Sequence, residues 1–208
     1  MYARSGLPDA SLEAAVNIAV FPAHQTTRAA DGLERRLFTV AEAVRMYELG
    51  ILEDKFELLE GEIVPMMNPA NNLHERIKLA LNRLLSRALP DHLQLGVETT
   101  AYLSDITFVN PDLSIFPMMK SDEVRGDHVL LAIEVAATTL KKDRGLKAAI
   151  YAKYGVRELW VIDARRMKTF VHTQPHAGGW GSNVEVPETG ELRFAHADVA
   201  FVTRLADL

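Results

Sequence analysis

The chain has 208 residues, a length that fits one compact domain with a tail or a small appended subdomain. Apolar residues make up 48% of the sequence and charged residues 25%, values that exclude a disordered, collagen-like or coiled-coil protein. There is no cysteine, which excludes disulfides, thiolate metal sites and cysteine nucleophiles. Any metal must therefore be bound by carboxylate or imidazole groups.

Charge and hydropathy bear on partners and location. The net charge of −5 gives no long-range attraction to nucleic acid or to anionic lipid, although a local basic patch can still bind either. The longest nearly apolar run, residues 14–23, is too short to span a bilayer and follows acidic residues, where a secretory signal would have positive charge. We therefore expect a cytoplasmic protein with no membrane partner.

The first elements are predicted by local signals. Residues 1–36 show no clear strand or helix pattern apart from one candidate helix, Ser11–Val20, and are expected to form an N-terminal extension. In the remainder, residues 37–208, a capping box of Thr39 and Glu42 predicts a helix that Gly50 can close. Residues 56–66 follow as two short strands around a tight Glu60-Gly61 turn.

The middle of the chain alternates helix and strand patterns. Apolar residues recur at helical spacing over Leu73–Leu89, which predicts an amphipathic helix stopped by Pro90. Residues 93–103 and 106–116 have the composition of strands, and a charged loop follows at 120–127.

A βαβ unit is predicted next. Val129–Ala136 is apolar on both faces except at Glu134, the pattern of a central strand covered on both sides. A helix over residues 141–154 and a second apolar strand, Glu158–Asp163, should place the two strands parallel. Residues 168–208 indicate a hairpin or short strands. The whole predicts an α/β (α+β) protein with a mixed central sheet flanked by helices and with C-terminal strands.

Glu134 is the most informative candidate residue. A buried carboxylate costs several kcal/mol unless it is paired, protonated or bound to a cation. A salt bridge to a lysine or arginine would satisfy it. Asp112, 22 positions earlier and directly after Pro111, offers a second explanation, because adjacent strands would bring the two carboxylates together as oxygen ligands for a hard cation such as Mg²⁺.

Further candidates lie around this pair. Lys147 falls on the flank of the sheet-facing side of its helix, where Asp143 could orient it through an i,i+4 pair or form a surface ion pair. His74 points inward near a helix start, as a core or capping histidine also would. Glu57 and Glu62, on either side of Gly61, could each supply another carboxylate, although hairpin glutamates are usually solvated.

Between residues 141 and 157 there are six basic residues and one acidic residue, a local charge of +5. Lys141, Lys142 and Arg144 are the candidates for contacts to a phosphate backbone. A solvated helix face explains the same pattern equally well.

These residues in this order resemble the Uma family of restriction endonucleases, within the PD-(D/E)XK nuclease superfamily. The matching segments lie between residues 37 and 165 and include the following: Phe56-Glu-Leu-Leu-Glu-Gly-Glu-Ile-Val64, Asn68-Pro69 with His74, Asn110-Pro-Asp-Leu113, Ile133-Glu-Val135, Lys147–Val156 and Glu158–Asp163. The resemblance implies a restriction-endonuclease-like fold whose central strands carry Asp112 and Glu134.

The resemblance also implies a mechanism, metal-assisted hydrolysis of phosphodiester bonds in DNA. Mg²⁺, or Mn²⁺ as a substitute, would be held by Asp112, Glu134 and the carbonyl of Val135. Lys147 would act as the catalytic lysine, with Glu62, His74 and Asp143 around the site. The expected partners are DNA and a second copy of the chain in a homodimer.

Ala136 departs from the superfamily motif, which has a lysine two residues after the glutamate. The resemblance offers Lys147, on the following helix, as its substitute. The alternative is a catalytically inactive protein that keeps the nuclease fold as a DNA-binding or self-assembling module. If Lys147 acts on water and phosphate, we expect Lys147→Ala to abolish cleavage and leave the fold almost unchanged.

Overall fold

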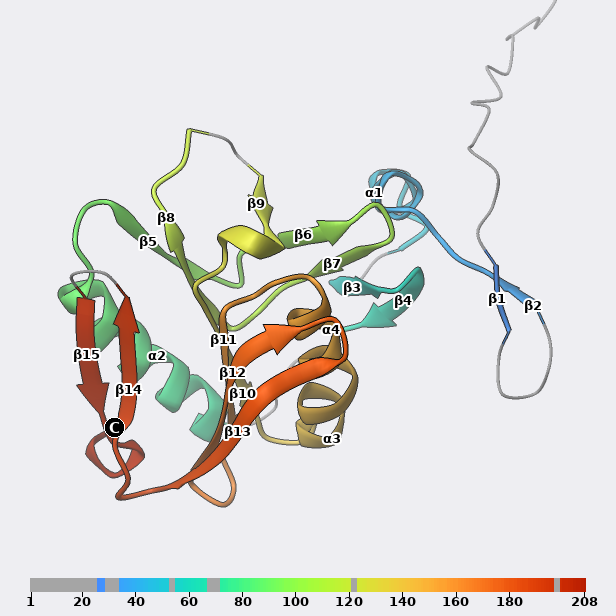
Figure 1. Cartoon of the computed structure of the whole chain (residues 1–208). Helices are drawn as coiled ribbons and strands as arrows, with labels where there is room; N and C mark the ends of the chain where they lie inside the picture. Colours follow the sequence, from blue (N-terminus) through green and yellow to red (C-terminus); the bar gives the residue numbers. More distant parts are fainter. Residues whose placement is uncertain (1–25, 29–33, 53–54, 67–71, 121–122, 197–198) are drawn as a thin grey trace, which may run out of the picture.

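The computed structural model describes residues 26–28, 34–52, 55–66, 72–120, 123–196 and 199–208. Its centre is a six-stranded sheet of order β13-β12-β11-β10-β8-β5 (Figure 1). These strands are β5 (Leu93–Val97), β8 (Leu113–Pro117), β10 (Leu131–Ala136), β11 (Glu158–Asp163), β12 (Lys168–His176) and β13 (Gly179–Pro187). Within this sheet β10 and β11 are parallel and the other neighbours are antiparallel. The predicted mixed central sheet is confirmed.

The connection from β10 to β11 is helical, as predicted. It begins as α3 (Leu140–Lys142), widens into a π-helical turn over Asp143–Lys147 and continues as α4 (Ala148–Lys153). A π-helical turn inserts an extra residue into the helix, and such turns are frequent at functional sites. It changes the angular positions of the side chains that follow it.

A second sheet of five strands has the order β4-β3-β7-β6-β9. Its strands are β3 (Phe56–Leu59), β4 (Glu62–Pro65), β6 (Ala101–Ser104), β7 (Thr107–Val109) and β9 (Val124–Arg125), and a 3₁₀ turn, Gly126–His128, follows. The predicted strands 93–103 and 106–116 are therefore wrong in extent, because each divides into two strands of different sheets. The breaks fall at Glu98, whose φ is 48°, and at Asn110-Pro111, where proline provides no backbone N–H.

Local signals place α1 and the β3–β4 hairpin. Helix α1 (Val40–Glu48) begins at the Thr39–Glu42 capping box. Glu60 and Gly61 both have positive φ, 52° and 82°, as a tight hairpin turn requires. Glycine is also needed for space, since a Cβ at Gly61 would lie 2.5 Å from Leu37 Cβ.

The two faces of the central sheet pack against different layers. Along β10, Leu131, Ile133 and Val135 join the core under α2 (Asn72–Ala88). Alternate residues of β10, Ala132 and Ala136, join the core on the α4 side. Glu134 lies between these two alanines, so the pleat directs its side chain to the α4 side.

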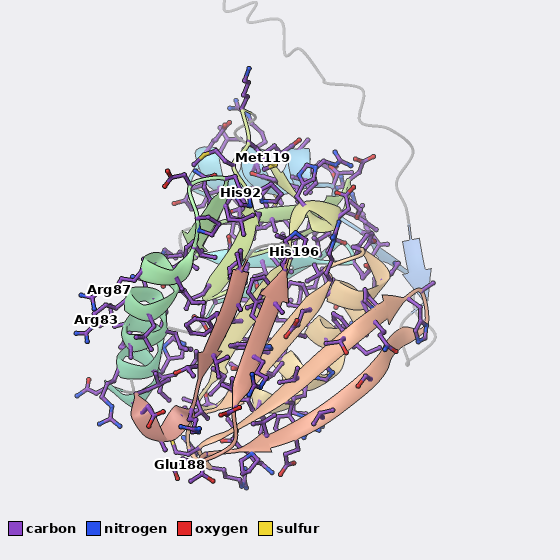
Figure 2. The ribbon with its side chains drawn as sticks, turned by 60° about the vertical axis from the view of Figure 1, so that its left-hand side comes forward. Arg83, Arg87, His92, Met119, Glu188 and His196 are labelled. Atoms are coloured by element: carbon purple, nitrogen blue, oxygen red, sulfur yellow. The ribbon has the colours of Figure 1, made fainter. Side chains whose placement is uncertain are left out.

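The C-terminal strands complete the α2 side. Strands β14 (Leu192–His196) and β15 (Val199–Thr203) form a hairpin beside α2, and a 3₁₀ turn, Leu205–Asp207, follows (Figure 1). Figure 2 shows Arg83 and Arg87 pointing away from the body on the outer side of α2. Leu81 and Leu85 on the same helix are fully buried, which confirms its predicted amphipathic character.

The N-terminal part differs from the prediction where it is described. Strands β1 (Thr26–Arg28) and β2 (Glu34–Arg36) pair antiparallel in a segment for which no strand was expected. Three-residue strands are too short to show an alternating pattern of apolar and polar residues, so they could not be predicted from this pattern. The candidate helix Ser11–Val20 lies outside the described residues. No described helix is long and apolar enough to cross a membrane.

His172 on β12 is a buried histidine with unsatisfied ring nitrogens. It is 3% exposed, and neither ring nitrogen has a hydrogen-bond partner in the described part of the chain. Burial, helped by the charge of Arg144, lowers its pKa from 6.5 to about 4. Between these values the unfolded chain binds a proton that the folded chain does not, so stability falls as pH drops through this window.

We expect His172→Leu to stabilise the protein, because leucine removes two unsatisfied nitrogen atoms. The free energy of unfolding should rise by about 1 kcal/mol at pH 7 and by about 3 kcal/mol at pH 5. Urea unfolding at the two pH values measures this. Equal stability of variant and native protein at pH 5 would contradict it.

Candidate functional site

Asp112 and Glu134 lie at the same end of two neighbouring central strands. Strand β8 pairs with β10 so that Leu113 lies opposite Ile133; Asp112 directly precedes Leu113 and Glu134 directly follows Ile133. If the register continues by one residue, Asp112 comes opposite Glu134. Directly opposite side chains in an antiparallel pair lie on the same face, about 5 Å apart at Cβ. The Asp112 carboxylate also accepts a hydrogen bond from the Val135 backbone N–H, at 2.7 Å. The predicted acidic pair is thus brought together.

Lys147 reaches this pair from the π-helical turn. Its ammonium lies 2.7 Å from Glu134 Oε1 and 2.7 Å from Glu57 Oε1. Lys147 is 3% exposed and Glu57 1%, so this bridge is shielded from solvent. Tyr151, one turn later, donates its hydroxyl to Glu134 Oε1 at 2.5 Å.

The cluster contains more carboxyl groups than lysines, and burial makes their ionisation costly. Burial raises the pKa of Glu134 to about 8, an effect that Lys147 opposes and that Asp143, Asp112 and Glu57 reinforce. Burial also raises the pKa of the Asp143 carboxyl. Although burial disfavours the charged ammonium, Glu134, Glu57 and Asp143 raise the pKa of Lys147. One buried lysine therefore interacts with three carboxyl groups.

His74, at the start of α2, contacts Asp112. Its Nε2 lies 3.1 Å from Asp112 Oδ1, and its Nδ1 lies 3.1 Å from Glu75 Oε1. Burial lowers the pKa of His74, but the hydrogen bond and charge of Asp112 outweigh it and the net change is upward. His74 and the Val135 N–H therefore both help to fix the position of the Asp112 carboxylate.

A cleft of about 500 Å³ opens over these groups. Its lining includes the following residues: Glu57, His74, Glu98, Asn110, Asp112, Glu134, Val135, Thr139, Lys142, Asp143, Lys147 and Arg165. Arg165, two residues after the end of β11, is exposed and offers the cleft a further cation, which was not among the predicted site residues.

The acidic residue from the β3–β4 hairpin is Glu57 and not Glu62. Register pairs Glu62 with Leu59, next to the turn, where Glu62 is exposed and does not line the cleft. Glu57 lies two residues further from the turn on the same face, with its Oε1 also accepting from the Asn110 N–H at 3.1 Å. Burial by itself would raise the pKa of the Glu57 carboxyl. The charge and hydrogen bond of Lys147, with smaller contributions from Lys142 and Asn110, outweigh burial, so the net change is downward.

Asp143 lines the cleft but does not pair with Lys147 as an α-helical i,i+4 partner would. The π-helical turn, which spans both residues, changes their relative angle. Thr139 instead donates its hydroxyl to Asp143 Oδ2 at 2.5 Å.

The predicted basic patch is only partly engaged in contacts within the protein, since Arg144, Lys153 and Arg157 are exposed. Lys142 lies 3.4 Å from Glu57 Oε2, and the Arg144 guanidinium lies over the Phe170 ring at 3.4 Å. Lys153 lies 2.6 Å from Glu60. Lys141 is exposed. The local charge of +5 is therefore not presented as one free basic surface.

The burial of Lys147 corrects one expectation. Lys147→Ala would leave Glu57 and Glu134 buried beside an empty position, and breaking a buried ion pair costs about 3–5 kcal/mol. The fold would therefore not be almost unchanged in stability.

The donor set fits a divalent cation completed by water. In the part of the chain that the structure describes, no three His, Asp or Glu side chains form a metal-binding group by themselves. The available donors are the Asp112 and Glu134 carboxylates with the Val135 carbonyl, and Mg²⁺ prefers oxygen donors and keeps several waters. A bound cation would favour the ionised forms of these buried carboxyl groups.

The fold is shared with a solved crystal structure. A structure described as a putative nuclease belonging to DUF820, from Anabaena variabilis ATCC 29413, matches with a TM-score of 0.62 at 18% sequence identity. The match covers 82% of this chain and 96% of that chain. The chain therefore has the restriction-endonuclease-like fold that the sequence predicted.

The family model of Uma2, described as "Putative restriction endonuclease", matches residues 45–197. The chain therefore belongs to the Uma2 family. No curated protein matches the sequence.

Proposed function

We propose that this protein is a metal-dependent endonuclease that hydrolyses phosphodiester bonds in DNA. Lys147 carries the proposal. Its ammonium contacts Glu134 from a neighbouring helix, in the cleft that Asp112 lines. It can therefore replace the lysine that the superfamily motif has two residues after the glutamate, where this chain has Ala136. Membership of the Uma2 family supports the same reading.

The chain's own residues have separate parts in this chemistry. A divalent cation held by Asp112, Glu134 and the Val135 carbonyl would polarise the scissile phosphate and lower the pKa of a bound water. Lys147 would donate hydrogen bonds to that water or to the phosphate oxygens as negative charge develops. Glu57 positions the Lys147 ammonium, and Tyr151 and His74 position the two carboxylates.

DNA would approach over the exposed cations at the rim of the cleft. Arg165 lines the cleft and Lys141 is exposed at the start of the crossover helix. Lys142 and Arg144 would first have to leave their partners Glu57 and Phe170.

A plasmid assay tests the function. The native protein should convert supercoiled plasmid to nicked or linear DNA with Mg²⁺ or Mn²⁺ and not with a chelator, and Asp112→Ala should be inactive. If the folded native protein leaves plasmid intact with both metals, the non-catalytic alternative, which Ala136 favours, replaces the proposal.

We expect Tyr151→Phe to reduce cleavage without unfolding the protein. The variant removes one hydrogen bond to Glu134 Oε1 and keeps the buried ring. Residues that hydrogen-bond to a metal-binding side chain and orient it typically contribute 10- to 100-fold to metal affinity or activity. Titration of the cleavage rate with Mn²⁺ should show a higher half-saturating concentration, and an unchanged titration would mean that Tyr151 only fills space.

A further inference from the structure

A second cavity of about 360 Å³ opens between α1 and the five-stranded sheet. Four aromatic rings line it in a chain from Tyr47 on α1 through Phe56 and Phe108 to Tyr102. Their successive centroids are 6.1, 5.4 and 6.1 Å apart, with the rings inclined to one another. Tyr47 is 53% exposed, so the cavity presents aromatic surface to solvent.

This aromatic cavity adjoins the candidate active site. Lys55, Met66, Glu98 and Asn110 line both spaces. Phe108 precedes Asp112 by four residues, so their Cα atoms are at most about 14 Å apart. A stacked strand advances about 3.4 Å per nucleotide. A strand with a phosphate at Asp112 can therefore place a base of a nearby nucleotide in the aromatic cavity.

The polar groups on the shared wall already have partners. Asn110 donates to the Phe56 carbonyl at 3.2 Å and accepts from the Thr100 hydroxyl at 2.6 Å. Glu98 accepts from Lys55 at 2.9 Å and from Lys78 at 2.8 Å. The aromatic cavity thus offers mainly ring faces, which suit a flat aromatic ligand bound by stacking.

Because nearby lysines are already paired within the protein, an unpaired base is favoured over a long DNA duplex as the ligand. Duplex binding depends mainly on cations that neutralise phosphates. In this protein Lys142, Lys147 and Lys153 are paired with glutamates of the β3 segment and its turn. Stacking on aromatic side chains does not need those cations and tolerates any base.

We propose that the aromatic cavity binds one unpaired nucleobase of the substrate strand beside the scissile phosphate. This inference rests on the proposed function, which it deepens: the preferred substrate is DNA that is single-stranded, or has an unpaired base, at the cleavage site. Base identity has little influence, because stacking rather than hydrogen bonding holds the base.

Binding of two DNA hairpins tests this, one fully paired and one with a single unpaired thymine, measured by fluorescence anisotropy in a chelator. The native protein should bind the second hairpin at least about five-fold more tightly, the smaller end of the effect of one stacked base. Tyr47→Leu should abolish this preference and Tyr47→Phe should retain it. Because Tyr47 is half exposed on α1, thermal unfolding should confirm that both variants stay folded.

The outcomes separate this inference from the proposed function. Equal binding of both hairpins, or a preference that survives Tyr47→Leu, overturns the inference even if the protein cleaves plasmid. A Tyr47-dependent preference without any cleavage supports the inference and overturns the proposed nuclease activity. If Tyr47→Leu instead dissociates a dimer seen by sedimentation and leaves hairpin binding unchanged, the aromatic cavity is a contact between copies, and the inference is wrong.

Discussion

Replacing Lys147 with methionine should abolish phosphodiester cleavage and lower the free energy of unfolding. The buried ammonium is the shared partner of Glu57 and Glu134, so its loss should destabilise the fold by about 3–5 kcal/mol. Loss of a hydrogen-bond donor to the developing charge should slow cleavage by about 100-fold or more. Urea unfolding and single-turnover plasmid cleavage measure the two effects.

A double variant separates stability from chemistry. Glu57→Gln combined with Lys147→Met removes one of the two buried carboxylates that lose the Lys147 ammonium in the single variant, so part of the lost stability should return. Cleavage should stay absent, because glutamine at position 57 does not replace the ammonium. Full activity in either variant would contradict the assignment of Lys147 as the catalytic lysine.

Replacing Glu134 with glutamine should weaken Mn²⁺ binding by about 100-fold or more, because the substitution removes one of two carboxylate ligands and its negative charge. The fold should tolerate the change, since the glutamine carbonyl oxygen can still accept from Tyr151, and Lys147 keeps Glu57. Calorimetric titration with Mn²⁺ measures the affinity.

Glu158→Gln is the matched control for that titration. Glu158 is a largely buried carboxylate at the opposite end of the neighbouring strand, bonded to the Trp160 indole at 2.5 Å. Its neutralisation should leave Mn²⁺ affinity unchanged. Equal affinities of the native protein and Glu134→Gln would remove the metal-site hypothesis.

The central strands and their acidic pair could be predicted because their signals are local. An apolar run interrupted by a single glutamate indicated β10, and the helix that follows indicated the parallel pairing with β11. Asp112 followed from its place beside Pro111 and from the family resemblance. These patterns are read from residues that are close in sequence and do not depend on contacts with distant parts of the chain.

The ion pair between Lys147 and Glu57 could not be predicted, because the two residues are 90 positions apart in the sequence. A hairpin glutamate next to a tight turn is usually solvated, and nothing local distinguishes Glu57 from Glu62. Their difference arises only when the β3–β4 hairpin packs on the crossover helix. The π-helical turn likewise has no sequence pattern, so the expected Asp143–Lys147 pair followed α-helical angles that the chain does not adopt there.

The central claim is that Asp112 and Glu134 hold one divalent cation in the cleft beside Lys147. Anomalous X-ray scattering from crystals grown with Mn²⁺ locates the ion directly. The account predicts one strong anomalous peak in contact with carboxylate oxygens of both residues and with the Val135 carbonyl, and no such peak in Asp112→Asn crystals. A peak elsewhere on the protein, or none in the cleft at saturating Mn²⁺, would contradict it.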